Sequence, residues 1–151
     1  MKTISFSPPD ITEAEIKEVA EALRSGWITT GPRTKKLEKE IANYCGTNKV
    51  VCLNSATASL ELNLRVLGIG PGDEVITSAY TYTASASVID HIGAKIVLID
   101  TAAGSYEMDY EKLESVITER TKAIIPVDLA GIPCNYSKIY EIINYKKHLF
   151  K

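Results

Sequence analysis

The hydrophobic positions in the first third of the chain recur at the three- and four-residue spacing of an amphipathic helix. They predict one helix that begins after Thr12 and stops at Gly26, and a second from Pro32 to about Gly46. Thr12 and Glu15 have the spacing of a capping box, and proline is favoured in a helix's first turn. The segment "GWITTGP" between the two helices is expected to be a loop.

From Val50 onward the pattern changes to short, continuous apolar runs that alternate with helical segments. Continuous runs are typical of parallel strands that are covered on both faces. The sequence therefore predicts an α/β fold, a mostly parallel sheet with helices on both faces. The strands are expected at 50–54, 73–77, 95–100 and 122–127, and the helices at 56–67, 82–92, 109–117 and 137–147.

This division predicts two parts, with N-terminal helices and a loop in residues 1–49 and a partial α/β domain in residues 50–151. The final "LFK" resembles the start of a fifth strand, so we expect the sheet to continue in a longer protein. A complete small domain with a frayed end is the alternative.

Composition narrows the possible partners. The 151 residues carry a net charge of −2 with no basic stripe, which disfavours nucleic acid and anionic membrane. No apolar run approaches the ~20 residues of a membrane span, and the start lacks the apolar region of a signal peptide. We expect a cytoplasmic protein whose cysteines are small buried residues in a reducing compartment, and no metal site, because His91 and His148 match no ligand spacing. The cysteines are Cys45, Cys52 and Cys134.

Small hydroxyl-bearing residues follow the first predicted strand, in the stretch "NSATAS". Open α/β sheets bind ligands beyond the carboxyl ends of their strands, and the first turn of a helix offers free N–H groups to an anion. Ser55, Thr57 and Ser59 could therefore form a phosphate cradle. The same residue types are ordinary helix N-caps, so capping without a ligand is an equally good interpretation.

The next strand is followed by "SAYTYTASAS", which should open on the same edge of the sheet. Tyr80 or Tyr82 could stack there on a flat ligand ring, or simply pack at a helix start. Asp128 closes the fourth predicted strand on the same edge. Its carboxylate could act on a substrate or cap its own loop.

Several blocks in order now resemble the N-terminal part of the DegT/DnrJ/StrS-type sugar aminotransferases. They are "GWITTGPRTKKLEKEIANYCG", "NSATASLEL", "GIGPGDEVITSAYTYTASAS" and "GAKIVLIDTAAGSYEMDYEKLESVITERTKAIIPVDLAG". The resemblance implies the aspartate-aminotransferase (fold type I) architecture and pyridoxal 5'-phosphate (PLP) as cofactor. It also implies amino transfer from glutamate to a nucleotide-linked keto sugar for polysaccharide biosynthesis, by a homodimer whose subunits share each active site.

The resemblance also assigns site residues. The cofactor phosphate would be bound by Thr57 and Ala58, with Ser55 in the same block, and the cofactor ring would stack on Tyr82. A loop near substrate or the partner subunit would contain Thr29, Thr30 and Gly31. The family usually has histidine where Asp128 stands, which leaves the role of this position open.

By the same resemblance, the lysine that forms a Schiff base with PLP and the aspartate that pairs with its pyridine nitrogen are not in this chain. Lys146, Lys147 and Lys151 lie in the wrong element to replace that lysine. We therefore expect no catalytic residue, weak or absent PLP binding and no activity of this polypeptide alone. The alternatives are a sugar dehydratase of the same family, in which histidine replaces the lysine, and a non-catalytic phosphate- or nucleotide-binding or structural fragment.

Overall fold

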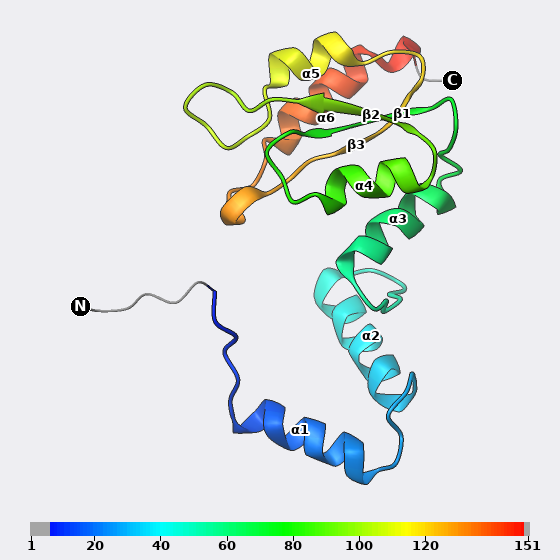
Figure 1. Cartoon of the computed structure of the whole chain (residues 1–151), viewed down its shortest axis with the longest axis vertical. Helices are drawn as coiled ribbons and strands as arrows, with labels where there is room; N and C mark the ends of the chain where they lie inside the picture. Colours follow the sequence, from blue (N-terminus) through cyan, green and yellow to red (C-terminus); the bar gives the residue numbers. More distant parts are fainter. Residues whose placement is uncertain (1–6, 150–151) are drawn as a thin grey trace, which may run out of the picture. The chain divides into compact units, whose positions relative to one another are not determined.

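The computed structural model describes residues 7–149 and divides the chain into two compact units. The first unit ends at Cys52 and the second begins at Leu53 (Figure 1). The two units are defined by how compactly each is packed, which does not test the domain boundary predicted at residue 49. That boundary stays a prediction.

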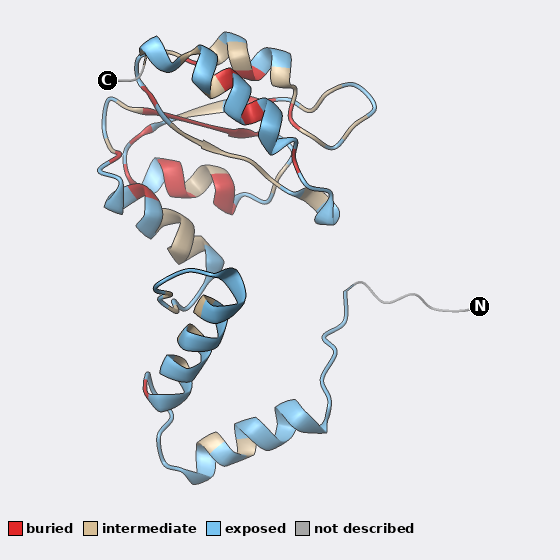
Figure 2. Cartoon of the chain, turned by 180° about the vertical axis from the view of Figure 1, so that it is seen from behind, coloured by how far each residue is buried: buried red, intermediate tan, exposed pale blue. Residues whose placement is uncertain are grey.

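The first unit contains the two predicted helices, α1 (Glu13–Arg24) and α2 (Pro32–Cys45). The capping box at the start of α1 is present, since the Thr12 hydroxyl accepts the Ala14 N–H at 3.2 Å and the Glu15 carboxylate accepts the Thr12 N–H at 2.6 Å. Gly46 ends α2 in the left-handed conformation. Neither helix has a buried residue, and Figure 2 shows both in pale blue and tan, the colours of exposed and intermediate residues.

The second unit is built on a parallel three-stranded sheet in the order β2-β1-β3. The central strand pairs Ile76 with Val97 on one side and with Ile124 on the other. All five residues of β1 are buried, whereas both outer strands are partly exposed. The strand bounds are β1 (Glu74–Ser78), β2 (Lys95–Ile99) and β3 (Thr121–Ile125).

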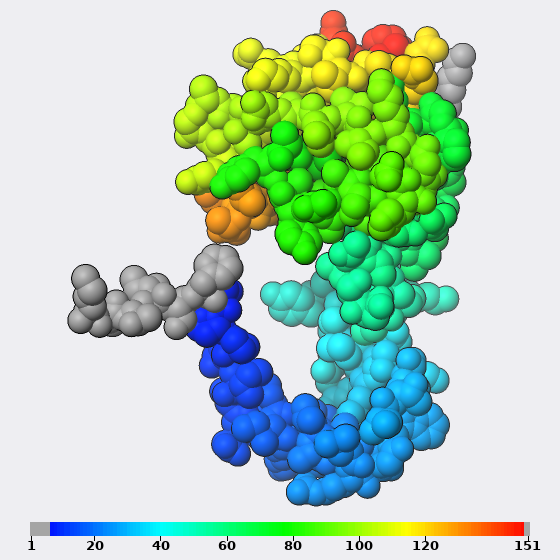
Figure 3. Space-filling view, viewed as in Figure 1, coloured from blue at the N-terminus to red at the C-terminus, as the bar shows by residue number. Residues whose placement is uncertain are grey.

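Helices cover both faces of this sheet, which confirms the predicted α/β fold (Figure 1). Alternating residues of β1 serve the two layers, with Val75 in the cluster that includes Leu64 and Ile89, and Ile76 in the cluster that includes Leu113. Figure 3 shows the side chains of this unit packed into one continuous body. One layer contains α3 (Ala56–Val66) and α4 (Ala84–His91), and the other α5 (Tyr110–Val116) and α6 (Tyr136–Tyr145).

One expected strand is wrong, and only the first residue of another is described. Residues 50–54 form no strand, and Val51 is 71% exposed. A strand is defined by pairing with a neighbouring strand, and no strand of the described residues pairs with this segment. Instead, the Cys52 N–H donates to Glu38 Oε1 on α2 at 3.0 Å. Leu149 closes the short 3₁₀ helix η2 (Lys147–Leu149) instead of opening a fifth strand. The other two residues of that expected strand lie outside the described part.

The cysteines also differ from expectation. Cys134 is buried and Cys52 half-buried, but Cys45 is exposed, because the last turn of α2 has no buried face. Residues 7–149 contain no group of three or more His, Cys, Asp or Glu side chains that could hold a metal ion. None of the helices described is both long and apolar enough to cross a membrane.

A buried carboxylate ties the strands together at the amino edge of the sheet. Glu74 is only 2% exposed, and it accepts hydrogen bonds from Thr118 Oγ1 at 2.6 Å, Arg120 Nη2 at 2.8 Å and Lys95 Nζ at 3.0 Å. These bonds, led by the one from Thr118, hold the pKa of the Glu74 carboxyl below its usual range. The amino edge is therefore a structural junction, and ligand chemistry is expected at the opposite edge.

Candidate functional site

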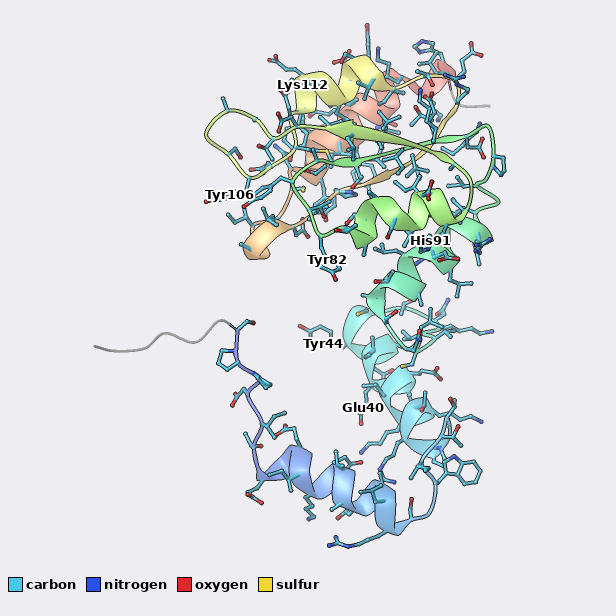
Figure 4. All side chains as sticks on the ribbon, viewed as in Figure 1. Glu40, Tyr44, Tyr82, His91, Tyr106 and Lys112 are labelled. Atoms are coloured by element: carbon cyan, nitrogen blue, oxygen red, sulfur yellow. The ribbon has the colours of Figure 1, made fainter. Side chains whose placement is uncertain are left out.

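Three loops leave the carboxyl edge of the sheet, after β1, β2 and β3. Parallel strands end at the same edge, where open α/β folds bind ligands. Figure 4 shows Tyr82, from the loop after β1, and Tyr106, from the loop after β2, on this edge.

The first turn of α3 combines an occupied cap with free donors. Ser55 Oγ accepts the N–H of Ala58 at 3.1 Å, and the Ser55 carbonyl accepts the N–H of Ser59 at 3.1 Å. The N–H groups of Ala56 and Thr57 have no hydrogen-bond partner within the described residues. Since the positive end of the helix dipole lies here, this turn can hold an anion such as a phosphate. Capping and anion binding are thus compatible, because Ser55 caps the helix while other N–H groups of the same turn stay available to an anion.

Tyr82 is presented by a turn held from within. Ser78 Oγ accepts the N–H of Tyr80 at 3.3 Å, and the hydroxyls of Thr81 and Ser85 lie 2.9 Å apart. The side chain of Tyr82 is 80% exposed, so it does not pack at the helix start. An exposed aromatic ring on a fixed turn is suited to stacking on a flat ligand ring.

The loop between β2 and α5 supports that turn. The rings of Tyr106 and Tyr80 are stacked with centroids 6.0 Å apart and an interplanar angle of 30°. In the same loop Glu107 accepts a hydrogen bond from the Tyr110 hydroxyl at 2.6 Å, and that hydroxyl accepts the N–H of Asn135 at 2.6 Å. Burial, together with the Glu107 carboxylate, raises the pKa of Tyr110 to about 12. Side chains thus link all three loops at this edge.

Asp128 caps its own loop. Its Oδ1 accepts the N–H of Cys134 at 2.8 Å, and the Tyr136 hydroxyl lies 3.1 and 3.0 Å from its two carboxylate oxygens. The Cys134 bond is the main cause that lowers the pKa of Asp128, while burial raises the pKa of the Cys134 thiol. Of the two roles left open for Asp128, the structure shows the capping contacts.

The predicted substrate loop lies in the first unit and is closed by its own tryptophan. Trp27 Nε1 donates to the Thr30 carbonyl at 3.1 Å, and the indole lies over the buried Gly31. A Cβ on Gly31 would lie 2.0 Å from Trp27 Nε1, so only glycine fits beneath the ring. Thr29 and Thr30 are exposed. Their role toward substrate or a partner subunit stays a prediction.

The structure places Ser55, Thr57 and Ala58 on one helical turn, and Tyr82 just before another helix on the same face of the sheet. Their cofactor roles stay predictions. The stacking of Tyr106 on Tyr80 was not anticipated from the sequence, since Tyr106 lies in a loop with no periodic pattern and meets Tyr80 only in the folded chain.

Comparisons with known proteins identify the family and the fold. The family model for DegT/DnrJ/EryC1/StrS aminotransferases matches residues 9–149. The chain is 48% identical over 134 residues to UDP-4-amino-4-deoxy-L-arabinose–oxoglutarate aminotransferase of Shewanella sediminis, spanning 89% of this chain and 34% of that protein. It is 43% identical over 139 residues to spore coat polysaccharide biosynthesis protein SpsC of Bacillus subtilis, spanning 92% of this chain and 36% of that protein.

Among solved structures, the putative sugar aminotransferase Spr1654 from Streptococcus pneumoniae in its PLP-form is 61% identical and superposes with a TM-score of 0.95. The match covers 99% of this chain and 38% of that one. The aminotransferase from Psychrobacter cryohalolentis is 32% identical with a TM-score of 0.85, over 95% of this chain and 37% of that one. The chain thus spans little more than a third of the length of these relatives.

Proposed function

Because the chain belongs to the DegT/DnrJ/EryC1/StrS aminotransferase family, whose members are PLP-dependent aminotransferases, we propose that it forms the phosphate-binding portion of a sugar aminotransferase. The complete enzyme would transfer an amino group from glutamate to a nucleotide-linked keto sugar. The name of the Shewanella relative supports both substrates, since it contains a UDP-linked sugar and oxoglutarate, the keto acid that corresponds to glutamate.

One observation carries the proposal: the first turn of α3 has two free N–H groups, at Ala56 and Thr57, beside the side-chain hydroxyl of Thr57. These donors would hold the cofactor phosphate, and Ala58 would contribute by sharing the N–H that Ser55 Oγ accepts. The exposed ring of Tyr82 would stack on the pyridine ring. When bound, PLP supplies an electron sink for the amino transfer.

The 151 residues by themselves are proposed to bind the cofactor weakly and to transfer no amino group. The family's lysine and aspartate fall, by resemblance, in the part of the relatives that this chain does not span. In the complete enzyme, a homo-oligomer, Thr29, Thr30 and Gly31 would contact substrate or the partner subunit.

The test uses pyridoxine 5'-phosphate, which has the ring and phosphate of the cofactor but no aldehyde to react with lysines. Titrated into ¹⁵N-labelled chain, it should shift the amide resonances of 56–58 and of 81–83, whereas inorganic phosphate should shift only the first group. Tyr82→Ala should remove the second group of shifts. Tyr140→Ala removes another well-exposed tyrosine, on α6, and is the matched control that should change neither group of shifts.

Shifts confined to other surfaces would refute the cradle. Weak binding is tested separately with PLP, followed by borohydride reduction and intact mass measurement. A single specific adduct, or a dissociation constant below about 10 μM, would show a working covalent site and overturn the proposed inactivity of this polypeptide.

A further inference from the structure

We propose that Tyr106 is a positioning residue that holds the Tyr82 turn in the conformation that binds the cofactor ring. This inference rests on the proposed function, but its first test needs no ligand. Tyr106 lies in the loop after β2 and Tyr82 in the turn after β1, so the two residues belong to different elements of the carboxyl edge (Figure 4).

The link between the two residues is the ring of Tyr80, which precedes Tyr82 by two positions. Tyr80 stacks on Tyr106 with a centroid separation of 6.0 Å, within the range of favourable aromatic pairs. The Tyr80 backbone is fixed as well, since its N–H donates to Ser78 Oγ. A turn fixed at Tyr80 constrains the backbone that carries Tyr82, whose own side chain is 80% exposed.

Tyr106 can serve as a clamp because its own loop is anchored. Thr101 and Met108 form an antiparallel bridge across the base of the loop, and Met108 is buried. The N–H of Asp109 donates to the Asp100 carbonyl at 3.0 Å, and Ala102 N–H donates to the Glu107 carbonyl at 3.0 Å. The loop is therefore a closed hairpin with Tyr106 near its tip.

The same loop is attached to the opposite side of the edge. Glu107, next to Tyr106, accepts a hydrogen bond from the hydroxyl of Tyr110. That hydroxyl in turn accepts a hydrogen bond from the N–H of Asn135, the N-cap residue of α6. The Tyr82 turn is thereby connected through Tyr80 and Tyr106 to the helix layer on the far face of the sheet. Removing the Tyr106 ring breaks this connection at its most exposed contact, since both rings are about half exposed.

The first measurement compares amide resonances and hydrogen exchange of 79–83 in the ligand-free wild type, Tyr106→Ala and Tyr106→Phe. The alanine variant should exchange faster in that segment alone, and the phenylalanine variant, which keeps the ring, should match the wild type. Tyr140→Ala is the control for losing an exposed tyrosine outside the three loops. No change in 79–83, or the same change with phenylalanine, would overturn the clamp.

The second measurement titrates pyridoxine 5'-phosphate and inorganic phosphate into the same variants. Tyr106→Ala should weaken the binding of pyridoxine 5'-phosphate about 2- to 12-fold, which corresponds to the usual free energy of an aromatic pair. The affinity for inorganic phosphate should not change. An equal loss for both ligands would indicate general destabilisation and refute positioning. If wild-type chain binds neither ligand, the proposed function fails, while the exchange data still decide whether Tyr106 holds the turn.

Discussion

The two units of this chain reach folded structure by different means. In the second unit, two clusters of fully or nearly buried side chains lie on either face of a parallel sheet. In the first unit, α1 and α2 bury no residue and are defined by caps, a proline and glycines. Local signals are sufficient to specify where a helix begins and ends, but burial provides most of the free energy that keeps it folded. The second unit should therefore respond to core substitutions and the first only to local ones.

The largest expected effect is on the core beneath α5. Leu113→Ala should lower the free energy of unfolding of the second unit by about 2–5 kcal/mol, because Leu113 is completely buried and its removal leaves a cavity. Urea unfolding followed by the amide resonances of β1 measures this change.

Leu37→Ala on α2 is the matched control, since Leu37 is 49% exposed and should cost about 1 kcal/mol or less. Its effect is measured through the fluorescence of Trp27, the one tryptophan in the chain, which reports on the first unit. Equal costs for the two leucine substitutions would remove the distinction between the units.

A smaller effect is expected at the amino edge of the sheet. Glu74→Gln should cost about 1–3 kcal/mol at pH 7, the usual loss when hydrogen bonds to a buried charged group are weakened. Because the folded state lowers the Glu74 pKa, its contribution is complete above the ordinary value of 4.5 and is lost as pH falls through the lowered value. The difference between wild type and variant, measured by urea unfolding, should therefore shrink in acid.

Glu40→Gln provides the comparison in the first unit, where Glu40 meets Lys36 at 3.8 Å with both side chains well exposed. Exposed pairs of this kind contribute little, so no measurable change is expected at either pH. A pH-independent cost for Glu74→Gln would show that the charge of Glu74 is unimportant.

The smallest effect is expected at the start of α1. Thr12→Ala removes the capping hydroxyl and should destabilise the first turn by about 1 kcal/mol. Faster hydrogen exchange at Ala14 and its neighbours is the measurement, and Thr12→Ser should restore protection. The exchange of β1 should not change. If it did, the two units would be coupled more closely than their division into two compact units indicates.

Sequence patterns predicted the local features and the α/β fold class, but not which distant segments contact one another, for a physical reason. The start of α1 is determined by residues three apart, Thr12 and Glu15, so the pattern contains it. The apolar run at 50–54 looked like a strand, but strand formation depends on a distant partner that no local pattern reveals. In the site, the small residues that begin at Ser55 predicted the start of a helix. The structure was needed to show which N–H groups of that first turn have no hydrogen-bond partner. The Tyr80–Tyr106 stack joins two loops that are distant in sequence, so the sequence pattern could not predict it either.

The indole of Trp27 over Gly31 has a consequence for how this loop can change by mutation. Any side chain at position 31 collides with the ring while Trp27 is in place, whereas loss of the ring frees the position. The two positions are therefore epistatic, and the order of substitution matters. A lineage that replaces Trp27 first can then vary position 31, but one that changes Gly31 first must displace the indole from its hydrogen bond to the Thr30 carbonyl.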